Sequence, residues 1–160
     1  MSLVRTFTLH DNEISVYADG HIEKIHKRWN RMHTIKQTAS DRGYCYIALR
    51  NNANTPTDIL VHRIIYLAHN PDWDLTYSQT NCIDHVDRNT SNNNINNLRV
   101  VTHQQNQFNR NAKGYHWNKC NKKWIAQLVI NDKKIHLGSF KTEAEASTAY
   151  QSAKLIHHVI

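Results

Sequence analysis

Residues 82–109, CIDHVDRNTSNNNINNLRVVTHQQNQFN, place two short apolar runs on either side of a long loop crowded with asparagine. The loop covers residues 88–97, and the two apolar runs that flank it predict two short strands. Thr102 and Gln105 then form a capping box, which predicts a helix through about Arg110. We therefore expect a compact ββα unit. Most of its asparagines should hold the loop, because the Asn side chain hydrogen-bonds nearby backbone and tolerates left-handed conformations.

Three polar residues of this unit can lie close together in the expected fold. Asp84 and His85 are adjacent, and at the end of a strand both can line one pocket. Asn106 lies in the first turn of the expected helix. Carboxylate and amide oxygens suit Mg²⁺, and a histidine beside such an ion can serve as a general base. Together these groups favour hydrolysis of a phosphodiester.

The stretch resembles the HNH endonuclease family, also called ββα-metal nucleases, and especially the homing endonucleases of phages and mobile introns. The matching positions run in order from Val61-His62-Arg63 to Asp84-His85, Asp87, Asn92-Asn93, Asn97-Leu98, Val100-Val101, and Thr102 to Asn106. The resemblance implies His85 as general base, with Asp84 and Asn106 as metal ligands. It also implies that Asn97 braces the loop, that one Mg²⁺ or Mn²⁺ binds per site, and that cleavage leaves 5′-phosphate and 3′-hydroxyl ends.

Four further residues near the motif have two interpretations each. His103 could replace Asn106 as a ligand, but Asn106 fits the family spacing, so His103 is assigned an exposed or phosphate-touching role. Arg99 and Arg110 could hold the scissile phosphate or be generic surface arginines. His62 could be catalytic or structural, and the structural interpretation is favoured.

Composition points to nucleic acid as the partner. The chain of 160 residues has 20 Lys and Arg against 13 Asp and Glu, a formal net charge of +7, so its field attracts polyanions. No apolar stretch approaches the roughly 20 residues that span a bilayer, so no membrane role is expected. The three cysteines form no C-x-x-C pair, which favours reduced thiols over a zinc module. We expect a cytoplasmic protein, in the bacterial host if a phage encodes it.

The N-terminal residues 1–56 predict strands and turns, with a hairpin that turns at Asp19-Gly20. Lys27, Arg28 and Arg31 surround Trp29, so this part is a candidate DNA contact, with a solvated loop as the alternative. Spacings of three and four residues, from Leu60 onward, predict a helix that ends before Asn70-Pro71.

Residues 113–160 predict three strands and a helix that opens with a second capping box, Thr142 and Glu145. This part resembles the AP2 DNA-binding domain through Gly114, Trp117, Trp124, Ala126, Leu137-Gly138-Ser139-Phe140, and Glu145-Ala146 to Tyr150. In that family the open sheet face enters the major groove. The candidate base-facing residues here are His116, Asn118, Gln127, Lys134 and His136, with phosphate contacts from Lys119, Lys122, Lys123 and Lys133. Trp117 and Trp124 are expected to pack beneath the sheet.

We thus predict an α+β protein of small modules: a β-rich part at 1–56, an HNH nuclease at 57–110 and an AP2-like reader at 113–160. The predicted function is metal-dependent, site-directed cleavage of double-stranded DNA, as a monomer that nicks or a homodimer that cuts both strands. A catalytically inactive DNA-binding regulator is the alternative. RNA is the alternative substrate, and an AP2-like reader favours duplex DNA.

Overall fold

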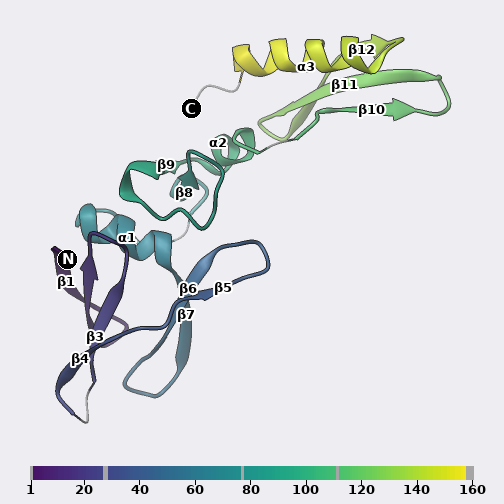
Figure 1. Ribbon diagram of the computed structural model, residues 1–160. Coiled ribbons are helices and arrows are strands. Elements are labelled where there is room, and N and C mark those ends of the chain that lie inside the picture. Colours follow the sequence, from purple (N-terminus) through teal and green to yellow (C-terminus); the bar gives the residue numbers. More distant parts are fainter. Residues whose placement is uncertain (1, 27–28, 77, 111, 158–160) are drawn as a thin grey trace. The chain divides into compact units, whose positions relative to one another are not determined.

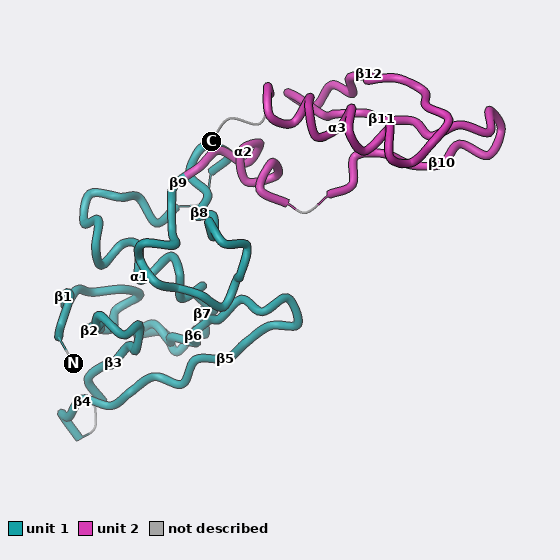
Figure 2. Tube along the Cα trace, turned by 45° about the horizontal axis from the view of Figure 1, so that its top comes forward, with its two compact units in different colours: residues 1–100 teal, residues 101–160 magenta. Residues whose placement is uncertain are grey.

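The structure is a computed structural model, and it describes residues 2–26, 29–76, 78–110 and 112–157. The chain divides into two compact units, residues 1–100 and 101–160, which are coloured separately in Figure 2. Small antiparallel sheets and few helices make up the fold, which confirms the predicted α+β class (Figure 1). The predicted division into three parts stays a prediction.

A four-stranded antiparallel sheet opens the first unit. Its spatial order follows the chain: β1 (Leu3–Leu9), β2 (Asn12–Tyr17), β3 (Ile22–His26) and β4 (Arg31–Thr34). The turn between β2 and β3 falls at Asp19-Gly20 as predicted, and Gly20 has a φ of +85°, a backbone conformation that glycine adopts without strain. This hairpin contributes three fully buried side chains, Ile14, Val16 and Ile22.

A second antiparallel sheet and the first helix complete the scaffold. The sheet contains β5 (Thr38–Ala39), β6 (Cys45–Arg50) and β7 (Pro56–Leu60), and α1 (Val61–His69) follows β7 directly. The prediction that Leu60 belongs to the helix was wrong: Leu60 ends β7 and its side chain is exposed. Its spacing to Ile64 fits a helix, but pairing of Leu60 with Tyr46 extends the sheet instead.

One hydrophobic core holds this unit together. It combines fully buried residues of the first sheet with Ile47 and Leu49 of β6, Val61 and Ile64 of α1, and Leu98 near the end of the unit. The segment with Asp84 and His85 is therefore attached to a scaffold that draws on strands more than 30 residues earlier in the sequence.

The central motif forms the two predicted strands, β8 (Cys82–His85) and β9 (Leu98–Val101), which pair as a two-stranded sheet. A short 3₁₀ helix, η1 (Ile95–Asn97), precedes β9. In β9, Leu98 and Val101 are buried, whereas Val100 is exposed.

The second unit begins with α2 (His103–Phe108), and both halves of the predicted Thr102–Gln105 capping box are present. It continues with β10 (Tyr115–Asn118), β11 (Lys123–Ile130), β12 (Lys133–Phe140) and α3 (Glu143–His157). The three strands form an antiparallel sheet in chain order, and α3 packs against it. The Thr142–Glu145 capping box that starts α3 is also confirmed.

The register of this sheet separates its two faces. Ala126 and Leu128 of β11 are buried on the same face as Trp124, and Trp124 pairs with Trp117 across the strands. The two indole rings meet edge to face with centroids 5.6 Å apart. Both rings lie on the side of the sheet that carries Ala126, but only Trp124 is half-buried. Trp117 is 43% exposed, so the prediction that it packs beneath the sheet was wrong.

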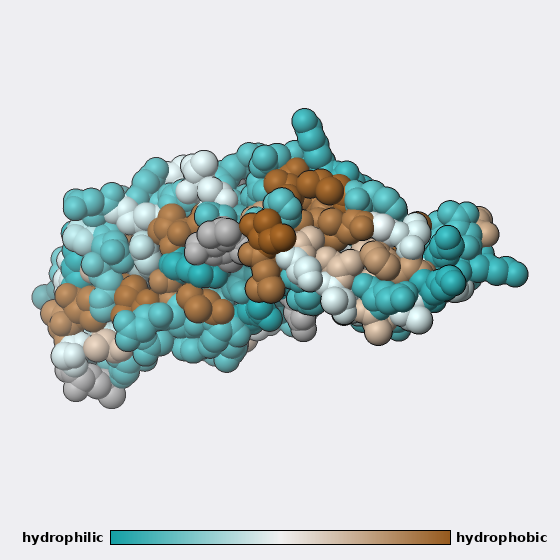
Figure 3. Space-filling model, turned by 90° about the horizontal axis from the view of Figure 1, so that it is seen from above, coloured by the Kyte–Doolittle hydropathy of each residue, from teal (hydrophilic) through white to brown (hydrophobic). Residues whose placement is uncertain are grey.

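The surface is mostly hydrophilic, with separate hydrophobic patches on the face that Figure 3 shows. The mean hydropathy of −0.70 agrees with that picture. Among the described residues, no helix is long and apolar enough to span a membrane. Cys45, Cys82 and Cys120 are free thiols, as predicted.

Candidate active site

Asp84 and His85 end strand β8 and are both almost fully buried, at 5% and 3% exposure. Charged and titratable side chains are rarely so buried without partners, because water no longer solvates them. The partners of these two residues therefore define what the site can do.

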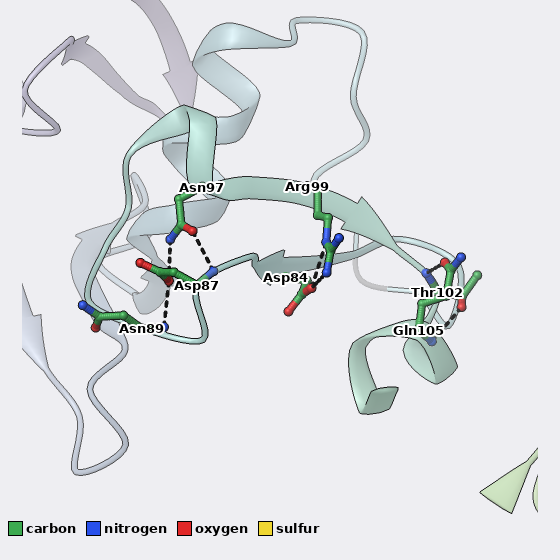
Figure 4. A network of polar contacts seen from close by, with 7 residues as sticks. All are labelled: Asp84, Asp87, Asn89, Asn97, Arg99, Thr102 and Gln105. Carbon is green, nitrogen blue, oxygen red and sulfur yellow. Dashed lines mark hydrogen bonds and ion pairs between the residues drawn. The ribbon is translucent and has the colours of Figure 1, made fainter. Parts of the chain in front are cut away.

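Arg99, on the neighbouring strand β9, is the partner of Asp84. Its Nε and Nη2 atoms donate to one carboxylate oxygen, Oδ2, at 3.0 and 2.8 Å (Figure 4). The arginine side chain is 32% exposed and the aspartate side chain 6%. Arg99, which the sequence suggested as a phosphate contact, thus lies against the predicted metal ligand.

Asn93 contacts His85. The Nε2 atom of His85 lies 3.1 Å from Oδ1 of Asn93. With Asn93 Oδ1 as the acceptor, His85 Nε2 is the donor, and in the tautomer with that single proton the lone pair lies on Nδ1. Asn93 is a site residue that sequence reasoning did not assign, because it stands among equivalent loop asparagines.

Asn97 ties the two ends of the loop together. Its Oδ1 accepts from the backbone N–H of Asp87 at 2.9 Å, and its Nδ2 donates to Asp87 Oδ1 at 2.9 Å and to the carbonyl of Asn92 at 2.8 Å. The backbone N–H of Val86 also donates to the carbonyl of Asn97. The segment that follows His85 is therefore fixed by one buried amide (Figure 4).

Asp87 collects the remaining loop contacts. Asn92 Nδ2 donates to its Oδ2 at 2.7 Å, and the backbone N–H of Asn89 donates to its Oδ1 at 2.8 Å. These hydrogen bonds, with that of Asn97, lower the pKa of Asp87 because they favour the carboxylate. Asn94 caps η1 by accepting from the backbone of Asn96. Most loop asparagines thus hold backbone or Asp87, as predicted.

His62 lies in the first turn of α1, 4% exposed, and its ring meets His85 edge to face with centroids 5.0 Å apart. Burial lowers the pKa of His62 to about 3, and the neighbouring His85 and Arg63 add to the effect. His62 is therefore neutral beside His85.

Three other predicted residues lie in the second unit. His103 is the first residue of α2, Asn106 lies within that helix, and Arg110 follows it. The side chain of His103 lies against Gln107, with 3.0 Å between His103 Nε2 and Gln107 Nε2. The structure brings together Asp84, His85, Asn97 and Arg99 in the first unit.

The predicted DNA contacts fall on two surfaces. Arg31 lies on β4 with its guanidinium 5.5 Å from the centroid of the Trp29 ring, while Lys27 and Arg28 lie outside the described residues. In the C-terminal sheet, cross-strand pairing places one set on the face opposite the buried Ala126: His116, Asn118, Lys123, Gln127, Lys134 and His136. Lys119, Lys122 and Lys133 lie at the ends of these strands.

One predicted ligand of the first unit suits a hard divalent cation. Asp84 provides a carboxylate, a donor that Mg²⁺ and Mn²⁺ accept, whereas Asn106, the other predicted ligand, lies in the second unit. Among the described parts of the chain, no group of three or more His, Cys, Asp and Glu gathers as a ligand cluster.

A family model matches the central part of the chain. Residues 60–108 match the model described as HNH endonuclease. Among solved structures, the chain is similar to the HNH homing endonuclease I-HmuI, described in a study of its DNA binding and cleavage. That match has 20% identity and a TM-score of 0.43, and covers 77% of this chain and 70% of that one. No curated protein matches. The AP2-like resemblance stays a prediction.

Proposed function

We propose that this protein is a site-directed DNA endonuclease of the homing type, which hydrolyses phosphodiester bonds with one Mg²⁺ or Mn²⁺. The observation that carries the proposal is the match of residues 60–108 to the HNH endonuclease family, because this range includes Asp84, His85, Asn97 and Asn106. The net charge of +7 supports a polyanionic substrate. The protein would act in the cytoplasm.

His85 is the general base in this proposal. With Nε2 donating to Asn93, the lone pair on Nδ1 takes a proton from the attacking water. Asn97 braces the loop that carries Asn93, so it keeps the base in place without touching substrate.

Asp84 is the proposed metal ligand of the first unit, and Asn106 is the second ligand implied by the family resemblance. When bound, the ion supplies positive charge that stabilises the phosphate and the leaving oxygen in the transition state. Arg99 holds Oδ2 of Asp84, which orients the carboxylate for that ion.

The C-terminal sheet is proposed to select the DNA. Its face opposite Ala126 carries amide, imidazole and lysine side chains and has no arginine. Asn and Gln favour adenine edges in the major groove, with each good bidentate contact worth about 1–3 kcal/mol of discrimination. Lysines at the strand ends would add phosphate contacts that do not depend on sequence.

The experiment that tests this function uses supercoiled plasmid and long phage DNA with the purified full chain. Wild type in Mg²⁺ or Mn²⁺ should nick or cut the DNA at mapped positions, and a chelator should abolish cleavage. Cleavage that persists in the chelator would contradict the metal requirement. Tight binding with intact DNA in every metal would favour the inactive regulator.

A further inference from the structure

Three aromatic rings meet at the proposed general base. His62 approaches His85 edge to face at 5.0 Å and 82°, and Tyr44 approaches it at 5.9 Å and 59°. Tyr44 and His62 also contact each other at 5.6 Å and 54°. Tilted contacts at these centroid distances are favourable for aromatic rings, and each one restricts the orientation of the ring that it touches.

Tyr44 comes from outside the HNH match. It immediately precedes β6, whereas the matched residues begin at position 60. The ring therefore comes from residues 1–56, the β-rich part that was predicted to contact DNA. His62 lies inside the match, and because its pKa is lowered to about 3 it adds no positive charge beside His85.

The turn before Tyr44 is attached to the asparagine loop. Thr90 Oγ1 donates to the carbonyl of Arg42 and Ser91 Oγ donates to that of Gly43, each at 2.8 Å. Gly43 has a φ of +79°, and a Cβ there would lie 2.7 Å from Thr90 Oγ1, so this close approach requires glycine. The same loop carries Asn93. The loop therefore holds both the turn before Tyr44 and the side chain that contacts His85 Nε2.

We propose that Tyr44 is a positioning residue for the general base. With His62, its ring limits rotation of the His85 imidazole, while Asn93 holds Nε2 by a hydrogen bond. Both restraints keep the lone pair on Nδ1 aimed in one direction, which a proton transfer requires. The inference rests on the proposed function only in taking His85 as the base.

The test compares Tyr44→Leu and Tyr44→Phe in the full chain on a mapped DNA site. Removing the ring should lower kcat by about tenfold to a hundredfold, because small displacements of a catalytic group have effects of this size. KM should stay within about twofold, since Tyr44 is not proposed to bind DNA. Tyr44→Phe keeps the ring and should restore kcat to near wild type.

Tyr66→Leu is the matched control. Tyr66 makes a similar edge-to-face contact, with Trp73 at 5.2 Å and 75°, in the same unit. Its loss should lower the melting temperature without lowering kcat. If Tyr44→Leu does not fold, Tyr44→Met removes the ring while keeping more side-chain volume.

A second readout does not depend on cleavage. Nitrogen-detected NMR of the His85 imidazole should show one Nε2-protonated form in wild type and Tyr44→Phe, and a mixed or broadened signal in Tyr44→Leu.

Unchanged kcat with an unchanged His85 signal in Tyr44→Leu would overturn the proposal. So would a loss in Tyr44→Phe equal to that in Tyr44→Leu, because the hydroxyl and not the ring would then matter. Wild type that leaves DNA intact would contradict the proposed function, and the NMR comparison would still decide this inference.

Discussion

The carboxylate of Asp84 receives both hydrogen bonds from Arg99 on a single oxygen, Oδ2. An ion pair with one partner this deeply buried differs from a surface pair, because the carboxylate has little access to water. The same aspartate is the proposed metal ligand, so Arg99 serves both stability and the geometry of the site.

Arg99→Ala should therefore destabilise the first unit. We expect the free energy of unfolding to fall by about 1–3 kcal/mol, less than for a fully buried pair because the arginine side chain is partly exposed. Urea denaturation measures the change. Adding Asp84→Asn to Arg99→Ala should recover part of the loss, since the uncompensated charge is removed. A double variant that is less stable than the sum of both single changes would contradict the pairing.

Asn93→Ala should lower the cleavage rate without weakening DNA binding. The change removes the acceptor that holds Nε2 of His85, so the imidazole can adopt the wrong tautomer or orientation. A loss of roughly tenfold or more in kcat is expected, as for other outer partners of catalytic histidines. Asn96→Ala is the matched control, because the backbone N–H of Asn96 donates to Asn94 and alanine keeps that group. Equal rates in both variants would argue against a role for Asn93.

His62 should make the protein less stable in acid. Its pKa is lowered to about 3 in the fold, against about 6.5 in an unfolded chain. Between these values the unfolded state binds a proton that the folded state does not, so stability falls as pH falls, by up to about 1.4 kcal/mol per pH unit. Denaturation curves below pH 6.5 measure how the free energy of unfolding changes with pH. This change should be less steep in His62→Phe than in His69→Phe, the control substitution at the exposed end of α1. A slope equal to that of wild type would contradict the assignment.

Asn106 is the proposed second metal ligand, and His103 is the alternative. We expect Asn106→Ala to weaken Mn²⁺ binding and cleavage by about tenfold or more, because a hard oxygen donor is lost. His103→Ala should have a smaller effect on Mn²⁺ affinity, measured by titration calorimetry. The reverse order of effects would exchange the two roles.

Local signals in the sequence predicted the parts of the fold that depend on neighbours along the chain. Both capping boxes, the Asp19-Gly20 turn and the strands around the asparagine loop follow from residues a few positions apart. Leu60 was misassigned because its spacing to Ile64 fits a helix, while pairing with Tyr46 decides its structure.

The site divides in the same way. Asp84, His85 and Asn97 were predicted as site residues because their spacing matches the family pattern. The contact of Asn93 with His85 was not, since Asn92, Asn93 and Asn94 are chemically identical and only the path of the loop separates them. Tyr44 lies 41 positions from His85 and reaches it through tertiary packing. No spacing rule could have indicated that contact.

The most direct test of the account is the single-turnover cleavage rate of His85→Ala on a mapped DNA site in saturating Mg²⁺. Loss of a general base should lower this rate by about 10²–10⁴-fold, with DNA affinity close to that of wild type and partial recovery on adding imidazole. A variant that cuts at nearly the wild-type rate would show that His85 is not the base, and the proposed mechanism would be wrong.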